Sequence, residues 1–434
     1  MTPRRIRTTL PAAAALAAVA SVAVAACGAP ASTSSVAASG SSAPATSPSA
    51  SASQSPSGKP SQPSRSALGG GSPAAGSTPT SGSQDRATAT PTCTNTTKLA
   101  GWSNQRLAMM TLAVPVDEND PSAVTSEVAA GAGGVLLFGS AAPADLGARL
   151  SALRSNVPDH LGLLVMTDEE GGGIQRMANL VGNLPWPAWM GGNWSAAQIQ
   201  QATTQVAQKM AAAGVNMDLA PVVDVDGTNA APSAQNPDGW RAFSGSTATV
   251  SQDGVAYMKG MMAGGVIPVV KHFPGLGGSS YNSDLGPAHT IPWSTEQQVG
   301  VPPFTAAIAA GAPAVMVSND SIPGLTSSPA GLSPAVINGE LKGNLGFKGL
   351  VITDALDAKA ISAAGYSVPT ATVQALRAGA DMVMFSLGPD VPGVTSATAT
   401  AVASAVTDGS LSRSRLIDAA NAVLTTRHVN LCQG

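Results

Sequence analysis

Short apolar runs recur along the chain after residue 93, separated by Ala-rich stretches that suit helices. The runs are rich in Val, Leu, Ile and Met and do not alternate with polar residues. This pattern is typical of parallel strands that are covered by helices, and each interval has room for a helix. The eight candidate strands are Thr111–Val116, Gly134–Phe138, Gly162–Thr167, Met217–Val222, Val266–Lys271, Ala314–Ser318, Gly349–Thr353 and Asp381–Phe385.

Eight strand and helix units in succession predict an α/β fold, a single TIM (β/α)8 barrel. A span of about 340 residues is larger than the ~250 of a typical barrel, which indicates inserted loops. A doubly wound open sheet is the alternative that the apolar runs alone leave open. We expect the barrel domain to occupy residues 93–434.

Polar side chains follow five successive predicted strands, and in a barrel these positions meet at the face where active sites lie. Such density is unusual for surface loops and predicts a functional site. The residues are Asp168, Glu169 and Glu170 after the third run, Asp224 and Asp226 after the fourth, Lys271 and His272 at the fifth, Asn319 and Asp320 after the sixth, and Asp354 after the seventh.

The N-terminus has the features of an export signal. A basic start precedes an apolar run from Leu10 to Ala26 that is too short for a transmembrane helix, so residues 1–26 are interpreted as a signal peptide. The sequence around Cys27 resembles a bacterial lipobox, which implies cleavage before Cys27 and lipidation of its sulfur. We therefore expect a lipoprotein on the outer side of the cell membrane, anchored through acyl chains.

Residues 27–92 consist almost entirely of Ser, Ala, Pro, Gly and Thr. Such a segment buries too little apolar surface to offset its ordering entropy, so it is expected to be a disordered tether. The remaining cysteines, Cys93 and Cys432, bracket the predicted barrel. In an exported protein they are expected to form a disulfide, with two free thiols as the alternative.

Charge and histidine content narrow the classes of partner. A net charge of −3 with 11% charged residues gives no basic footprint for nucleic acid. The four histidines form no cluster with ligand spacing along the sequence, so neither a metal nor another cofactor is expected. We expect a monomer.

The run Lys271-His272-Phe273-Pro274-Gly275-Leu276-Gly277 resembles the K-H-F-P-G-H-G signature of the bacterial β-N-acetylglucosaminidases of glycoside hydrolase family 3. Four further segments match motifs of that family in the same order. They are Asp168-Glu-Glu-Gly-Gly-Gly-Ile-Gln-Arg176, Met217-Asp-Leu-Ala-Pro-Val-Val-Asp224-Val, Arg241-Ala-Phe-Ser-Gly and Gly349-Leu-Val-Ile-Thr-Asp354-Ala-Leu.

The resemblance implies a retaining glycosidase that removes terminal β-linked N-acetylglucosamine, with cell-wall glycans as the expected substrate. Asp354 stands at the position of the family's nucleophile, although from its local sequence it is also a good helix N-cap. From the residues alone, Arg176 and Arg241 are interpreted as neutralising Asp168 and Glu170 in an ion-pair network, whereas the resemblance implies five residues that bind the sugar. They are Asp168, Arg176, Arg241, Lys271 and His272.

The chain departs from the family at the general acid, where an Asp and a His are replaced by Asn282 and Asp284. Asp284 is the first candidate for the acid, because burial near Asp354 would raise its pKa. His289 is the second, Glu170 and Asp320 are further ones, and a site without a competent acid is the remaining possibility.

Two changes in the expected pocket, Gly173 for an Arg and Leu276 for a His, leave the sugar open. The alternatives are a sugar-binding lipoprotein without activity, and a β-glucosidase or glycoside phosphorylase on the same fold. The segment with Trp186, Trp189 and Trp194 is interpreted as packing on the barrel rather than as a platform for sugar.

Overall fold

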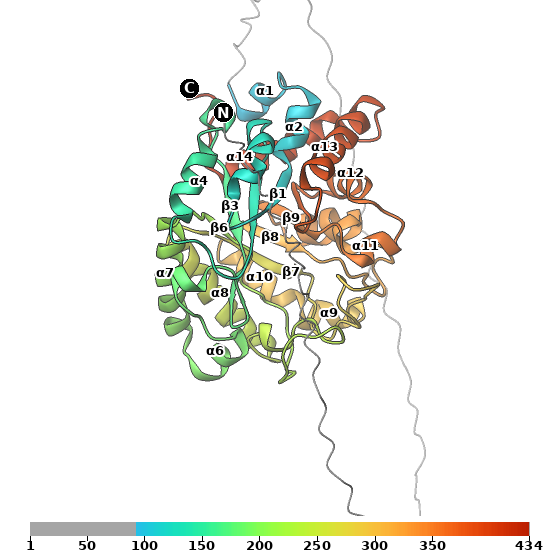
Figure 1. Ribbon diagram of the computed structural model, residues 1–434. Helices are drawn as coiled ribbons and strands as arrows, with labels where there is room; N and C mark the ends of the chain where they lie inside the picture. The colour runs from blue at the N-terminus through green and yellow to red at the C-terminus, as the bar shows by residue number, and fades with distance from the viewer. Residues whose placement is uncertain (1–92, 434) are drawn as a thin grey trace, which may run out of the picture. The chain divides into compact units, whose positions relative to one another are not determined.

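A computed structural model describes residues 93–433 of the chain. Its centre is a closed barrel of parallel strands in the order β1-β10-β9-β8-β7-β6-β3-β2 (Figure 1). The closed barrel confirms the predicted TIM fold and excludes the open doubly wound sheet. The barrel strands are β1 (Leu112–Asp117), β2 (Gly134–Phe138), β3 (Leu164–Thr167), β6 (Met217–Asp218), β7 (Ile267–Phe273), β8 (Ala314–Val317), β9 (Leu350–Ala355) and β10 (Met382–Met384).

All eight predicted strands are confirmed, with ends that shift by a few residues. Side chains are buried along nearly the whole length of these strands. Burial on both faces explains why the sequence shows continuous apolar runs instead of alternation. The structure adds a small antiparallel hairpin, β4 (Glu169–Gly171) and β5 (Ile174–Gln175), which the polar sequence after β3 did not predict.

Helices cover the outside of the barrel, and the longest begin at clear capping residues. Ser195 forms a capping box with Gln198 at the start of α7, and the Ser246 side chain caps α8. The helices are α1 (Asn95–Leu99), α2 (Asn104–Met110), α3 (Thr125–Ala129), α4 (Leu146–Arg154), α5 (Ala178–Val181), α6 (Pro187–Asn193), α7 (Ala196–Ala212), α8 (Thr247–Ala263), α9 (Trp293–Val299), α10 (Val301–Ala309), α11 (Lys359–Ala363), α12 (Val368–Ala378), α13 (Val391–Thr407) and α14 (Arg413–Thr426).

The two ends of the described chain are tied together. Cys93 and Cys432 form a disulfide, the pairing expected from their positions. The Asn95 side chain also donates to the carbonyl of Val429 and accepts from the amide of Leu431. Helices α1 and α14 therefore lie side by side and close the N-terminal end of the barrel (Figure 1).

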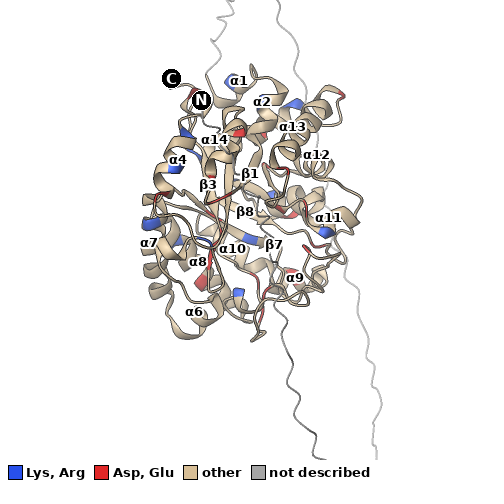
Figure 2. Cartoon of the chain, viewed as in Figure 1, with Lys and Arg blue, Asp and Glu red and all other residues tan. Residues whose placement is uncertain are grey.

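Lys and Arg residues are sparse and scattered over many elements (Figure 2). No helix among residues 93–433 is long and apolar enough to cross a membrane. The predicted signal peptide, Cys27 and the predicted tether lie outside the described residues.

Candidate active site

A cavity of about 290 Å³ lies at the C-terminal ends of the barrel strands. Its walls come from segments far apart in the sequence, as expected for a site built at the strand ends. The sequence-predicted residues that line it are Asp168, Arg176, Arg241, Lys271, His272, Asp284 and Asp354, together with Glu170, Leu276, Asn282 and Ser283.

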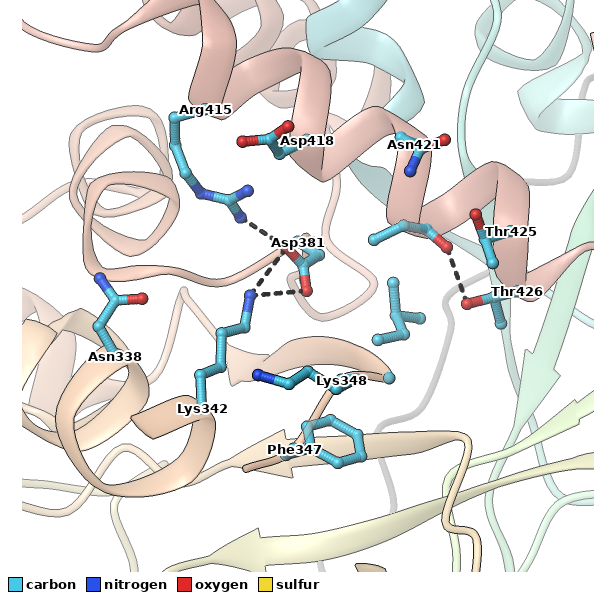
Figure 3. A pocket seen from close by; sticks show the side chains of 13 residues that line it. Asn338, Lys342, Phe347, Lys348, Asp381, Arg415, Asp418, Asn421, Thr425 and Thr426 are labelled. Atoms are coloured by element: carbon cyan, nitrogen blue, oxygen red, sulfur yellow. Dashed lines mark hydrogen bonds and ion pairs between the residues drawn. The ribbon is translucent and has the colours of Figure 1, made fainter. Parts of the chain in front are cut away.

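A second cavity, of about 490 Å³, lies near the starts of β9 and β10 at the opposite end of the barrel (Figure 3). Its charged centre is Asp381, which accepts from Lys342 at 3.1 Å and from Arg415 at 2.6 Å. Lys342 and Arg415 also donate to the carbonyl of Gly379 and so bind the end of α12. This network stabilises the fold at the N-terminal face of the barrel.

Asp354 lies within β9 and points one carboxylate oxygen at the amide of Ala355, at 2.7 Å. The following helix, α11, begins only at Lys359 and has Ala358 as its N-cap residue. Asp354 is therefore not a helix cap, and its half-buried carboxylate faces the cavity.

A buried ion-pair network forms one wall of the cavity. Lys271 Nζ lies 2.8 Å from Asp168 Oδ1 and 2.7 Å from Glu170 Oε1, and Arg241 binds both oxygens of Glu170 at 2.8 and 2.9 Å. Burial opposes ionisation of Glu170, but the charges of Arg241 and Lys271 outweigh it and hold its pKa well below the usual range. Glu170 is thus a permanent carboxylate and not a proton donor.

Arg176 extends this wall toward the rim. Its Nη2 lies 3.7 Å from Asp168 Oδ2, and its Nη1 donates to the carbonyl of Gly139 at 3.4 Å. The guanidinium also lies 5.7 Å from the centre of the Phe138 ring. These contacts fix the guanidinium of Arg176 where it lines the cavity and can donate hydrogen bonds into it.

His272 is fixed by two partners. Its Nδ1 lies 2.7 Å from Asp224 Oδ2, and its Nε2 lies 3.3 Å from Arg241 Nη2. Because a guanidinium only donates, Nε2 accepts and Nδ1 carries the proton that it donates to Asp224. The ring therefore has a single tautomer in this arrangement.

Asp284 lies in a loop that is hydrogen-bonded to α11, the helix that follows Asp354 and β9. The Asn282 side chain accepts from the amide of Asp284 at 2.8 Å. The carbonyls of Ser283 and Asp284 accept from the amides of Ala360 and Lys359 in α11. The loop is thereby anchored to the helix that follows β9.

The pKa of Asp284 is raised to about 6, first by desolvation and then by the negative charge of Asp354. Its side chain keeps contact with solvent at the cavity mouth, while protein surrounds it on the other sides. A carboxyl group with this pKa retains its proton near neutral pH far more often than an ordinary Asp. Asp284 can therefore donate a proton within the cavity that Asp354 also lines.

The other candidate acids lie elsewhere. His289 is exposed and borders a separate depression formed with Ser321–Ser327, and its Nδ1 lies 3.0 Å from the carbonyl of Thr290. Burial raises the pKa of Asp320 to about 7, but this carboxylate is buried against the hydroxyl of Ser279 and does not line the cavity.

The two substitutions near the cavity have distinct surroundings. Leu276 is buried and lines the cavity, with its amide bound to Asp224. Gly173 packs beneath Trp186, where an added Cβ would lie 2.9 Å from the ring, so a longer side chain requires Trp186 to move.

The three tryptophans pack in pairs. Trp186 lies 6.0 Å from Trp240 and Trp189 lies 5.5 Å from Trp194, measured between ring centres. None of Trp186, Trp189 and Trp194 lines the cavity at the strand ends.

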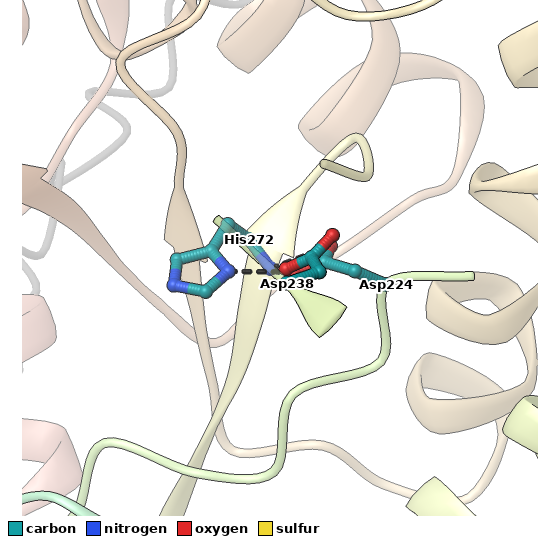
Figure 4. Close-up of side chains that lie close together, drawn as sticks. All are labelled: Asp224, Asp238 and His272. Carbon is teal, nitrogen blue, oxygen red and sulfur yellow. Dashed lines mark hydrogen bonds and ion pairs between the residues drawn. The ribbon is translucent and has the colours of Figure 1, made fainter. Parts of the chain in front are cut away.

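Three potential metal ligands lie together beneath the cavity: Asp224, Asp238 and His272 (Figure 4). The spacing of residues along the sequence did not predict this group, which forms only in three dimensions. Asp238 carried no signal in the sequence, because it lies in an irregular insertion after β6 and only the folding of that insertion brings it to His272.

Comparison with known proteins agrees with this architecture. Residues 109–426 match the glycosyl hydrolase family 3 N terminal domain. The beta-hexosaminidase LpqI of Mycobacterium tuberculosis is 34% identical over 240 residues, which span 54% of this chain and 61% of that protein. A beta-hexosaminidase of Stenotrophomonas maltophilia is 34% identical over 231 residues, 51% of this chain and 66% of that protein. The alignments thus span less than two thirds of these curated relatives.

Solved structures give wider coverage. That of M. tuberculosis LpqI is 30% identical, with a TM-score of 0.69 over 77% of this chain and 96% of that chain. The beta-N-acetylhexosaminidase of Beutenbergia cavernae is also 30% identical, with a TM-score of 0.69 over 76% of this chain and 100% of that chain. The family match covers most of the chain and confirms the resemblance found in its motifs. The chain therefore belongs to glycosyl hydrolase family 3.

Proposed function

We propose that the protein is a retaining β-N-acetylhexosaminidase that removes terminal β-linked N-acetylglucosamine from cell-wall glycans. The observation that carries this proposal is a pair of unlike carboxyl groups in one cavity. Asp354 is held as an acceptor at the end of β9, whereas Asp284 has a pKa raised to about 6. The similarity to proteins named beta-hexosaminidase supports the choice of sugar.

In the first step Asp354 attacks the anomeric carbon and forms a glycosyl ester, while the glycosidic oxygen leaves. Retaining enzymes place the two carboxyl groups about 5–5.5 Å apart to make this displacement possible. The bond from the amide of Ala355 fixes one oxygen of Asp354 and leaves the other to attack. Asp284 transfers its proton to the departing oxygen.

In the second step the roles of Asp284 reverse. As a carboxylate it takes a proton from water, and the water oxygen attacks the anomeric carbon and releases Asp354. The proton that Asp284 gave to the leaving sugar is replaced by the proton from water, and Asp354 is again a free carboxylate, so both side chains return to their starting states. Retention of configuration follows from the two successive displacements.

The ion-pair wall holds the sugar during both steps. Asp168 and Arg176 offer an acceptor and a donor near the rim, and Lys271, His272 and Arg241 line the deeper part. Paired donors and acceptors suit vicinal hydroxyl groups. Their mutual bonds fix these side chains before substrate binds, so little ordering entropy is lost on binding.

Asn282 serves as a positioning residue for Asp284. Its side-chain oxygen accepts from the Asp284 amide and tightens the turn that carries the acid. The neutral amide leaves the charge of Asp354 as the main nearby source of the raised pKa, after desolvation.

The N-terminal sequence supports an exported lipoprotein, held at the cell membrane through Cys27 with the barrel on the outer side. A disulfide between Cys93 and Cys432 suits an oxidising compartment. We propose that the protein acts there as a monomer on carbohydrate.

The test is hydrolysis of 4-nitrophenyl β-N-acetylglucosaminide beside the β-glucoside, with full-length protein in detergent and an Asp354→Asn control. We expect release from the N-acetyl substrate and its loss in the control. Release from the glucoside alone contradicts the proposed sugar. Binding of N-acetylglucosamine without release from either substrate contradicts the proposed activity.

A further inference from the structure

Beneath the cavity, three side chains from separate segments converge on one point. Asp224 follows β6, Asp238 precedes a short turn at 239–241, and His272 lies in β7. Each offers a ligand atom, and these atoms lie within 4.8 Å of one another. Asp224 and Asp238 are 0% exposed and His272 is 4% exposed, so the group is shielded from bulk water.

Asp238 is the unusual member. It is fully buried, no donor group among residues 93–433 reaches either of its carboxyl oxygens, and its side chain lies within hydrogen-bonding reach of the Asp224 carboxylate. Buried carboxylates are normally paired or bound to a cation, because desolvation of an isolated charge is costly. Arg241 is the cation that faces Asp238, and it is already bound to both oxygens of Glu170.

Asp224 is oriented for a ligand by the backbone. Its Oδ1 accepts from the amides of His272 at 3.1 Å and Leu276 at 2.9 Å, which directs Oδ2 toward the imidazole. Such hydrogen bonds behind a ligand atom are typical of metal sites, where they fix the carboxylate before the ion arrives.

We propose that Asp224, Asp238 and His272 bind one divalent transition-metal ion, Zn²⁺ or Mn²⁺, beneath the sugar pocket. An imidazole nitrogen with two carboxylate oxygens is a donor set that suits these ions. The two positive charges balance the two carboxylates, which otherwise repel each other in a buried place. The proposal concerns metal binding and does not depend on the glycosidase activity.

Metal binding rearranges the protons of the site. Nδ1 of His272 must lose the proton that it donates to Asp224, and the neutral ring then carries its proton on Nε2. The contact of Arg241 with Nε2 is lost, while the two bonds of Arg241 to Glu170 remain. The ion therefore converts Nε2, at the cavity wall, from an acceptor into a donor.

The test measures metal uptake directly. Full-length protein without a histidine tag is stripped with a chelator in detergent, and Zn²⁺ or Mn²⁺ is titrated by calorimetry, with bound metal counted after desalting by mass spectrometry. We expect about one ion per chain for the unaltered protein. Asp238→Asn, which removes one anionic ligand and keeps the shape, should weaken binding at least tenfold.

Asp320→Asn is the matched control, because Asp320 is a buried carboxylate outside the cluster. It should bind metal like the unaltered protein. Failure of the unaltered protein to take up either ion refutes the proposal, whether or not the variants fold. Equal binding by Asp238→Asn also refutes it, and assigns the bound metal to another place. In that case Asp238 is a buried protonated acid.

Discussion

Replacement of Asp284 by Asn removes the proposed general acid while it keeps the size of the side chain. In the structure, desolvation and the charge of Asp354 raise the pKa of Asp284 to about 6 from the ordinary 3.8. At pH 7 a group of that pKa is about one tenth protonated, roughly 100-fold more than an ordinary Asp. Because a general acid typically contributes about 10²–10⁴-fold, kcat on a disaccharide of N-acetylglucosamine should fall by that factor.

The leaving group separates this role from simple damage to the site. 4-Nitrophenolate needs little protonation, so Asp284→Asn should still form the glycosyl enzyme and release a burst of 4-nitrophenol. Turnover then stalls, because no base activates water. Azide needs no base, and it should restore turnover as a glycosyl azide. Asp354→Asn should show neither burst nor rescue.

The pH profile gives the same test a second readout. For the unaltered protein, kcat/KM on the disaccharide should fall as pH rises through about 6, as Asp284 loses its proton. In Asp284→Asn this fall of kcat/KM with rising pH, the alkaline limb of the profile, should vanish. Disaccharide hydrolysis within threefold of the unaltered rate, with the limb intact, would refute the assignment of Asp284.

Two further predictions concern residues that support the site. Asn282→Ala removes the acceptor for the Asp284 amide and should lower kcat on the disaccharide about tenfold with little change in KM. Asn282→Asp keeps an acceptor, so it should recover most of that rate, and its added charge should move the fall of kcat/KM to higher pH. Equal loss of rate in both variants would argue against a positioning role. Glu296 is buried, no group in the described part of the chain forms a hydrogen bond with its carboxyl oxygens, and desolvation raises its pKa to about 9. Below about pH 4.5, the pKa of Glu296 in the unfolded chain, both states hold the proton and the side chain costs no stability. As pH rises toward 9 only the folded state keeps the proton, so the free energy of unfolding falls. Glu296→Gln removes this cost and should stabilise the protein by a few kcal/mol at pH 7.5 and by little at pH 4.5. Urea unfolding at the two pH values checks this, and equal effects at both would contradict it.

The sequence alone determined the barrel and much of its candidate site. Apolar runs without alternation identified all eight barrel strands, because burial on both faces leaves its mark residue by residue. The polar ends of those strands identified Asp168, Lys271, His272 and Asp354, since parallel strands bring their C-terminal ends to one face. Such patterns are local, and local patterns survive in a linear sequence.

Tertiary structure decided what these residues do to one another. Asp354 has the local sequence of a helix cap, yet the path of the chain keeps it in β9, with α11 beginning later. His289 lies only five positions from Asp284, but its loop carries it away from the cavity. The ionisation of Glu170 and Asp284 and the meeting of Asp238 with His272 depend on burial and on charges distant in sequence. Distances between such groups exist only once the barrel has closed, and electrostatic interactions depend on those distances.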